Sequence, residues 1–447
     1  MPATEPAGRM KRRTMVGTLL LVMLSSCQLR AQGQQHGSNS GQASASQSPP
    51  STPLPETLDD TLEAGDDELT VPARKLVTWN EFEGDSASAR VGAGFLYEYA
   101  AYSQDEAGKE QFALFPTAQI RDARFIFKGS FGADRRVTWS AGIMYDAAAT
   151  KDFLVRETGV MVAVPRLSGH IFVGRTKEGF SLNKIMVGYA GWTMERATMN
   201  DATIPILADG IKWLGYAPKK HLLWNLGVFM DALSENQSFS TYDHQIVGRI
   251  VWLPEENEET VLHIGLDLRY GKPDNGQLRL RSRPEAFEAP YFIDTGSFPA
   301  KHTTTADVET YFRPGPLLFG TEYFVQKVDA PDTGNPFFQG VDSVVSWLAT
   351  GETRVYNTRG GFFNQVSPAH PVFTGGPGAW EIVGRFSYSD LTSGPLQGGK
   401  FWRFTPMVNW HLSDNVRLEL TYGYGSLNRF GLIGATQFFQ TRLQLQL

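Results

Sequence analysis

Hydrophobic and polar residues alternate along the chain from residue 89 onward. In the segment 416–424, every even position is apolar and every odd position is polar or glycine. Residues 261–270 and 439–447 follow the same period of two. Because successive side chains of a β-strand point to opposite faces, this pattern predicts strands with one apolar and one polar face.

Sixteen segments of this kind are predicted to be strands. They lie at 89–103, 119–131, 135–147, 153–164, 169–176, 208–217, 221–231, 241–253, 260–270, 303–313, 317–329, 336–349, 379–391, 400–411, 415–426 and 436–447. Several connections are short turns, such as 217–220, whereas 104–118, 177–207 and 271–302 are long. Short turns at one end and long loops at the other are typical of outer-membrane barrels. Segment 350–378 is an exception, because it is a long connection on the predicted short-turn side.

The apolar faces of these strands need a cover, which is a second layer in water or lipid in a bilayer. The sequence contains no convincing long amphipathic helix, and no apolar run of 18 residues outside the N-terminus. We therefore predict an all-β fold, a transmembrane antiparallel β-barrel of about 16 strands with both termini at the periplasmic end. The mean hydropathy of −0.26, typical of a soluble protein, is then the average of a lipid face and a lumen face.

Aromatic residues near the predicted strand ends are candidates for the two girdles at the membrane interfaces. They are Trp139, Tyr145, Trp213, Tyr216, Trp224, Trp252, Tyr311, Trp402 and Trp410. The alternative is that aromatic side chains are simply common in strands.

The N-terminus has the features of a secretory signal. Basic residues 11–13 precede an apolar run at 15–24, which predicts a signal peptide over residues 1–31. Two cleavage sites fit the sequence, one after Ala31 and one before Cys27, which would then carry a lipid. Cys27 is the single cysteine, so the sequence offers neither a disulfide framework nor a thiolate metal cluster.

Residues 32–85 are rich in Gln, Ser and Pro and then in acidic residues, so we expect a disordered periplasmic segment. Residues 1–85 hold 11 of the 47 acids and seven of the 41 bases, which leaves 36 acids and 34 bases from residue 86 onward. The predicted barrel domain, residues 86–447, is therefore nearly neutral. This balance argues against a nucleic-acid partner, whose phosphates require a basic surface.

Motifs for catalysis are missing from the sequence. The eight histidines include no pair at a spacing of four, and neither a GxSxG elbow nor a phosphate-binding GxxxxGK[ST] loop occurs. We expect no catalytic residue, no metal site and no cofactor.

Four stretches resemble the phosphate-selective porin O and P family of bacterial outer membranes. They are 173–182 (VGRTKEGFSL), 194–196 (MER), 348–357 (LATGETRVYN) and 378–391 (GAWEIVGRFSYSDL). The resemblance covers about residues 89–447. It implies a sixteen-stranded barrel that forms a homotrimer, with 177–207 as a constriction loop folded into the lumen. The chain departs from the family pattern at Gly179 (usually Pro), at Phe386 (often Tyr) and at Leu447 (often Phe).

Basic residues in the long loops and on the lumen-facing phase of the strands are candidates for an anion pathway. The candidates are Lys177, Lys184 and Arg196 in the constriction loop, Arg279, Arg281 and Arg283 in the 271–302 loop, and Arg175 and Arg385 on strands. The spacing of two in the 271–302 loop predicts that its three arginines share one face of an extended segment, where guanidiniums bind phosphate well. The alternative is that these bases are paired with acids and only line a hydrated wall.

The sequence as a whole predicts a bacterial outer-membrane porin through which small hydrophilic solutes diffuse passively, with a preference for anions or phosphate. Its expected partners are outer-membrane lipid, these solutes and two further copies of the chain. The alternative is a secreted β-rich protein that binds or acts on carbohydrate. A third hypothesis is a lipidated surface adhesion module, which requires that Cys27 carries a lipid.

Overall fold

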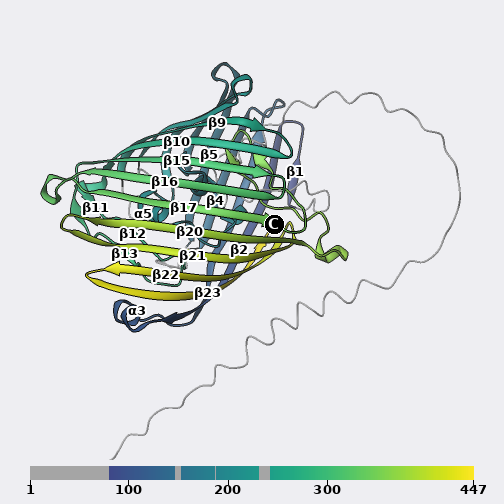
Figure 1. The fold of residues 1–447 in the computed structure, drawn as a ribbon. Coiled ribbons are helices and arrows are strands. Elements are labelled where there is room, and N and C mark those ends of the chain that lie inside the picture. Colours follow the sequence, from purple (N-terminus) through teal and green to yellow (C-terminus); the bar gives the residue numbers. More distant parts are fainter. Residues whose placement is uncertain (1–79, 146–152, 187, 231–241) are drawn as a thin grey trace, which may run out of the picture. The chain divides into compact units, whose positions relative to one another are not determined.

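A closed antiparallel β-barrel makes up the body of the protein (Figure 1). The computed structural model describes residues 80–145, 153–186, 188–230 and 242–447. Its sixteen barrel strands are β2 (Ala87–Gln104), β3 (Thr117–Phe131), β4 (Val137–Tyr145), β5 (Phe153–Val164), β6 (Gly169–Thr176), β7 (Ala208–Ala217), β8 (Leu222–Met230), β9 (Tyr242–Glu256), β10 (Thr260–Pro273), β15 (His302–Pro314), β16 (Leu317–Asp329), β17 (Phe337–Leu348), β20 (Ala379–Ser393), β21 (Leu396–Ser413), β22 (Val416–Arg429) and β23 (Leu432–Gln446).

Each barrel strand pairs with its neighbours in chain order, and β23 pairs with β2 to close the barrel. All sixteen strands correspond to segments predicted from the alternation, which confirms the predicted fold class. The largest boundary differences are at β21, which begins four residues early at Leu396, and at β23, which begins four residues early at Leu432. The alternative of a secreted sandwich or repeat fold is wrong, because the first and last strands join in a single ring.

The alternation separates an apolar outside from a polar inside, as β10 illustrates. Leu266 and Leu268 are 50% and 54% exposed on the outer face, while Asp267 and Arg269 are 0% and 1% exposed on the inner face. This arrangement is the reverse of a soluble protein and suits a barrel surrounded by lipid. No helix within the described residues is long and apolar enough to cross a membrane.

Two aromatic residues assigned to the membrane girdles are not on the outer face. Tyr311 is 1% exposed and donates a hydrogen bond to the carboxylate of Glu322, at 2.7 Å. Tyr216 packs beside Leu223 in a small interior cluster. Both side chains point to the inside of the barrel, so the prediction that they belong to a membrane girdle is wrong for these two residues. Trp410 does lie on the outer face, where it stacks on Trp380.

Three long connections carry most of the remaining elements, and each contacts the inner wall. The β6–β7 connection holds α4 (Leu182–Ile185), η3 (Gly188–Ala190) and α5 (Thr198–Thr203). The β10–β15 connection holds η5 (Asp274–Gly276), β11 (Gln277–Leu278), β12 (Arg281–Ser282), β13 (Ile293–Asp294) and β14 (Phe298–Pro299). The β17–β20 connection holds β18 (Tyr356–Asn357), β19 (Phe362–Phe363) and η7 (Val372–Thr374). Elsewhere lie α3 (Glu106–Gln111) between β2 and β3, and the 3-10 turns η2 (Pro165–Leu167), η4 (Pro218–Lys220) and η6 (Pro331–Thr333).

The β17–β20 connection, residues 349–378, leaves the barrel at the end that carries the short turns. Leu317 at the start of β16 pairs with Trp347, and Ala379 pairs with His411 near the 414–415 turn. The long connection 349–378 therefore does lie on the side of the short turns.

A short strand, β1 (Glu81–Glu83), pairs with the beginning of β2. The predicted disordered segment extends to residue 85. Residues 81–83 instead form a strand, which pairs with the part of the β2 edge that β23 leaves unpaired. The predicted signal peptide, Cys27 and the rest of the linker lie outside the described residues.

Candidate functional site

The β6–β7 connection, residues 177–207, is held against the inner wall at its start by acidic side chains. The Ser181 amide donates to Asp267 of β10, and the Asn183 amide donates to Glu322 of β16 at 2.8 Å. The Ser181 hydroxyl donates to the other oxygen of Glu322 at 2.6 Å. Amide groups at the start of the loop thus satisfy carboxylates that are fully buried.

Guanidinium groups hold the second half of the same loop through its carbonyl oxygens. These contacts are Arg354 to Ala190 at 2.9 Å, Arg417 to Gly191 at 2.7 Å, Arg442 to Met194 at 2.5 Å and Arg385 to Glu195 at 2.8 Å. Three of the four arginines come from the wall strands β20, β22 and β23. Charge-assisted hydrogen bonds of this kind are stronger than neutral ones, so the loop is firmly attached to the wall.

Glu195 is the acidic centre of this attachment. Arg121 donates to both of its carboxylate oxygens, at 2.8 and 3.0 Å, and Arg442 lies 2.6 Å away. Burial opposes ionisation of the Glu195 carboxyl, but Arg121 and Arg442 outweigh it and lower the pKa to about 2. Glu195 is therefore ionised at neutral pH.

The β17–β20 connection reaches the same region from the other end of the barrel. Arg354 of this connection binds both oxygens of Glu381 on β20, at 2.8 and 2.9 Å. The ring of Phe363 lies 6.2 Å from that of Trp192 in the constriction loop. Arg249 of β9 donates to the Gly361 carbonyl at 2.8 Å. The lumen is therefore narrowed by segments that enter from both ends.

The β10–β15 connection also touches the inner wall. Arg403 of β21 donates to the carbonyls of Pro284 and Glu285, at 2.7 and 2.9 Å. Arg385 lies 3.4 Å from the Glu285 carboxylate. These contacts hold residues 284–285 beside the constriction loop, which Arg385 also binds.

Arginines and aromatic rings alternate in a stack that begins in this connection. Arg281 lies 4.2 Å above the Tyr291 ring, and Arg283 lies 4.9 Å from Tyr291 and 5.2 Å from Phe287. Arg121 of β3 covers the other ring of the series, Phe287, at 3.9 Å. We call Arg281, Tyr291, Arg283, Phe287 and Arg121 the arginine stack.

The three arginines of the β10–β15 connection lie on one face, as their spacing indicates. Leu280 and Ser282 between them are buried, whereas Arg279 is exposed and Arg281 and Arg283 are half-buried. Arg279 forms a bidentate ion pair with Asp294, at 2.9 and 2.5 Å. For Arg281 and Arg283, the described part of the chain provides no carboxylate at ion-pair distance.

Of the candidates in the constriction loop, Lys177 and Lys184 are buried and Arg196 is half-buried, and all three are bound. Lys177 donates to the Met186 carbonyl at 3.0 Å, and Lys184 on α4 lies 3.4 Å from Asp201. Arg196 donates to the carbonyls of Asn183 and Met186, both at 3.2 Å. Lys184 and Arg196 join the two halves of the loop, and Lys177 fixes the first half.

The two anion-pathway candidates that lie on strands, Arg175 and Arg385, are paired with acids on neighbouring strands. Arg175 of β6 binds Asp209 of β7, at 2.8 and 3.2 Å, and Arg385 of β20 binds Asp342 of β17 at 2.5 Å. The structure therefore brings Arg385 and Arg196 to the same loop, and places Arg175 at a separate pair in the wall.

Sequence reasoning missed Arg121 and Arg354 as parts of this site. Arg121 is the extra residue of a β-bulge, since Leu96 pairs with Asp122 and Tyr97 pairs with Ile120. A bulge turns two successive side chains to one face, so a strict alternation places Arg121 wrongly. Arg354 lies in a connection that has no alternation, and its only signal is the family-like stretch 348–357.

Comparisons with known proteins agree with this architecture. The family model described as phosphate-selective porin O and P matches residues 90–447. An uncharacterized protein of Caulobacter vibrioides is 28% identical over 272 residues, covering 57% of this chain and 53% of the relative. Porin O of Pseudomonas aeruginosa is 23% identical over 206 residues, covering 39% and 46%. The chain thus spans about half the length of the curated relatives it matches.

Solved structures with similar folds are outer-membrane barrels. OmpT of Vibrio cholerae with loop L8 deleted has a TM-score of 0.53 at 10% identity, with 81% of this chain and 100% of that chain covered. The channel DcaP of Acinetobacter baumannii has a TM-score of 0.52 at 9% identity, with 82% and 99% covered. These likenesses establish the fold, and the family match covers the whole barrel. The chain belongs to the phosphate-selective porin O and P family.

Proposed function

We propose that this chain is a porin that lets small hydrophilic solutes diffuse across the outer membrane and that prefers anions, phosphate among them. The family and the fold point to the bacterial outer membrane, and they are those of channels rather than of enzymes. The single observation that carries the anion preference is the arginine stack, with Arg281 and Arg283 half-buried and unpaired with acids in the described part of the chain.

The chemistry of the stack suits a phosphate. A guanidinium is planar, always charged and able to donate two parallel hydrogen bonds to one phosphate. The Tyr291 and Phe287 rings lie against these groups, which fixes their planes without neutralising their charge. Arg283 also donates to the Ala289 carbonyl, so an anion would meet its remaining N–H groups together with those of Arg281.

The other candidate bases support this choice by elimination. Arg175, Arg385, Arg279 and Lys184 each have a carboxylate partner. Lys177 is buried against a loop carbonyl, and Arg196 binds two loop carbonyls where Arg283 binds one. A paired base contributes little net field in the lumen. Since the barrel is nearly neutral, selectivity depends on where the unpaired charges lie.

The test is a selectivity measurement in planar bilayers. Wild-type protein in a KCl gradient should give a reversal potential of the sign expected for an anion-preferring channel, and added phosphate should reduce the chloride current. In the double variant R281Q/R283Q the anion preference should fall. Block by phosphate should weaken at least about tenfold, since the loss of even one charge-assisted hydrogen bond has that effect.

The matched control is K219Q/K220Q, which removes two charges from the exposed η4 turn. This control should keep the wild-type reversal potential and phosphate block. A clear cation preference of the wild type would contradict the proposal. An unchanged preference in R281Q/R283Q would leave the porin function standing and remove the role of the stack.

A further inference from the structure

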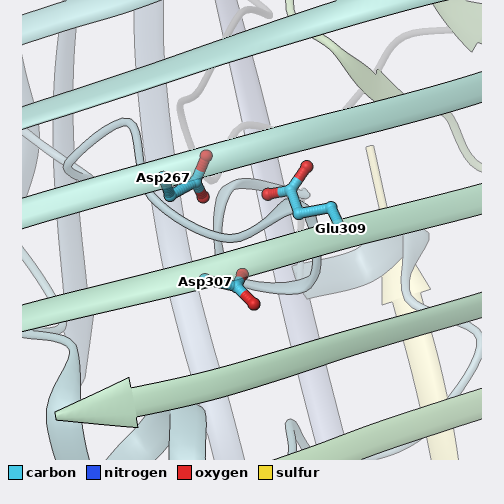
Figure 2. Close-up of side chains that lie close together, drawn as sticks. All are labelled: Asp267, Asp307 and Glu309. Atoms are coloured by element: carbon cyan, nitrogen blue, oxygen red, sulfur yellow. The ribbon is translucent and has the colours of Figure 1, made fainter.

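Three carboxylates converge on the inner wall beneath the start of the constriction loop. Figure 2 shows Asp267 of β10 with Asp307 and Glu309 of β15. Asp267 and Asp307 are direct partners across the two strands, and Glu309 stands opposite Gly265. One oxygen of each carboxylate lies within 4.8 Å of the others, and all three side chains are 0% exposed.

The charges in this cluster, Asp267, Asp307 and Glu309, are only partly balanced. Arg249 donates to both Glu309 oxygens, at 3.0 and 2.7 Å, and lies 3.6 Å from Asp267. His263 adds a 2.7 Å hydrogen bond to Glu309. One guanidinium therefore faces three carboxylates.

Asp307 is the decisive member of the cluster. Among the described residues, neither of its oxygens has a hydrogen-bond partner, although the side chain is fully buried and directed toward the other two acids (Figure 2). The neighbouring acid Glu322 is different, because Ser181, Asn183 and Tyr311 all donate to it. A buried charge without a partner is very unfavourable, and like charges directly opposite on two strands repel.

We propose that this cluster binds one divalent, oxygen-preferring cation, with Ca²⁺ as the best fit. Carboxylate oxygens are the ligands that such hard cations select. Ligand oxygens lie about 2.4 Å from Ca²⁺, so two ligands of one ion are separated by at most about 5 Å, and the cluster meets this limit. The two positive charges of the ion also balance the two negative charges that remain when Arg249 is set against the three carboxylates.

The oxygens available to the ion can be named. Asp307 offers both of its oxygens, and Asp267 offers the one that does not accept the Ser181 amide. Glu309 offers a second lone pair on an oxygen that already accepts a hydrogen bond. Gly265 leaves the space that the Glu309 carboxylate occupies, since a Cβ there would lie 2.5 Å from it.

A cation here would act on the constriction loop. Asp267 binds both the proposed ion and the Ser181 amide, so the ion would hold the start of the loop to the wall. It would also remove negative charge from the lumen of a channel proposed to prefer anions, and this consequence rests on the proposed function. The binding itself does not depend on that function.

The experiment measures binding without current. Protein refolded from denaturant, free of lipopolysaccharide and treated with EDTA, is dialysed against radioactive Ca²⁺ in detergent. Wild type should bind one ion per chain, and Ca²⁺ should raise the temperature at which its heat-modifiable gel shift occurs. D307N should lose both effects while folding normally, because an amide of the same shape relieves the repulsion.

The matched control is D329N, an exposed Asp at the end of β16, which should keep wild-type binding. Absence of bound Ca²⁺ in the wild type overturns the proposal whether or not D307N folds, as does equal binding by wild type and D307N. A wild-type unfolding temperature that responds to pH and not to Ca²⁺ would mean that a proton occupies the cluster. Each of these results leaves the selectivity measurements unaffected, so the two proposals fail separately.

Discussion

At the scale of the residue, the sequence predicts that an arginine faces the lumen but not which partner it meets. Arg175 and Asp209 are direct partners across β6 and β7, and Glu98 and Arg442 are direct partners across β2 and β23. Such pairs depend on the register between strands that are 34 and 344 residues apart. Alternation within one strand carries no information about this register, so the neutralised and the unpaired arginines look alike in the sequence.

Glu195 provides a prediction at this scale. Its pKa is lowered to about 2 from an ordinary value of 4.5, so its ion pairs stabilise the fold fully above about pH 4.5. This stabilisation is lost as the pH falls toward 2. At pH 7 we expect Glu195→Gln to reduce the free energy of unfolding in urea by about 3 kcal/mol, the usual cost of breaking a buried ion pair. The difference between wild type and variant should shrink as the pH falls from 5 to 2.

The control for this prediction is Glu106→Gln, which removes an exposed acid from α3 whose partner Lys109 is also exposed. That change should alter the free energy of unfolding by less than about 0.5 kcal/mol at any pH. Equal stability of Glu195→Gln and wild type at pH 7 would show that Arg121 and Arg442 do not depend on this carboxylate.

At the scale of the element, the strands were predictable and the connections were not. Lipid on one side and a polar lumen on the other impose a period of two, and all sixteen strands show it. Apart from the arginines at 279, 281 and 283, the connections 274–301 and 349–378 follow no such period, and contacts such as Arg354 with Glu381 join them to the wall. The resemblance to the family identified the first constriction loop, whereas no local pattern indicated the other two.

The bulge in β3 provides a prediction at this scale. Deletion of Arg121 would remove the extra residue and leave a regular ladder, because Leu96 and Tyr97 already pair with Asp122 and Ile120. Ile120 would keep its place on the outer face. We therefore expect the deletion and Arg121→Ala, which keeps the bulge, to refold with the same yield and to show the gel shift at the same temperature. A lower yield or a lower gel-shift temperature for the deletion alone would show that the bulge is needed to set the register.

At the scale of the whole molecule, the protein is one barrel domain that follows an N-terminal region. We propose that residues 1–31 are a signal peptide, that 32–85 form a periplasmic segment that includes β1, and that three copies associate. Exposed apolar side chains lie on the outer face of the barrel, and we propose that outer-membrane lipid covers most of this surface. Contact between barrels would bury part of it.

Native mass spectrometry in mild detergent tests the assembly and the N-terminus together. We expect a complex of three chains, because buried apolar surface holds barrels together until the sample is heated. Each chain should have the mass of a product that begins at Gln32. A single-chain species under these conditions would contradict the trimer, and a mass that includes a lipidated Cys27 would contradict cleavage after Ala31.

The seam between the first and last strands has a practical consequence. Leu447 exchanges backbone hydrogen bonds with Ala93 of β2, and the next position along the same edge is taken by Asn80, whose carbonyl accepts the Val91 amide. Residues fused after Leu447 would therefore compete with β1 for β2. An affinity tag placed there would either displace β1 or bend away from the wall, and a tag inserted before residue 80 avoids this conflict.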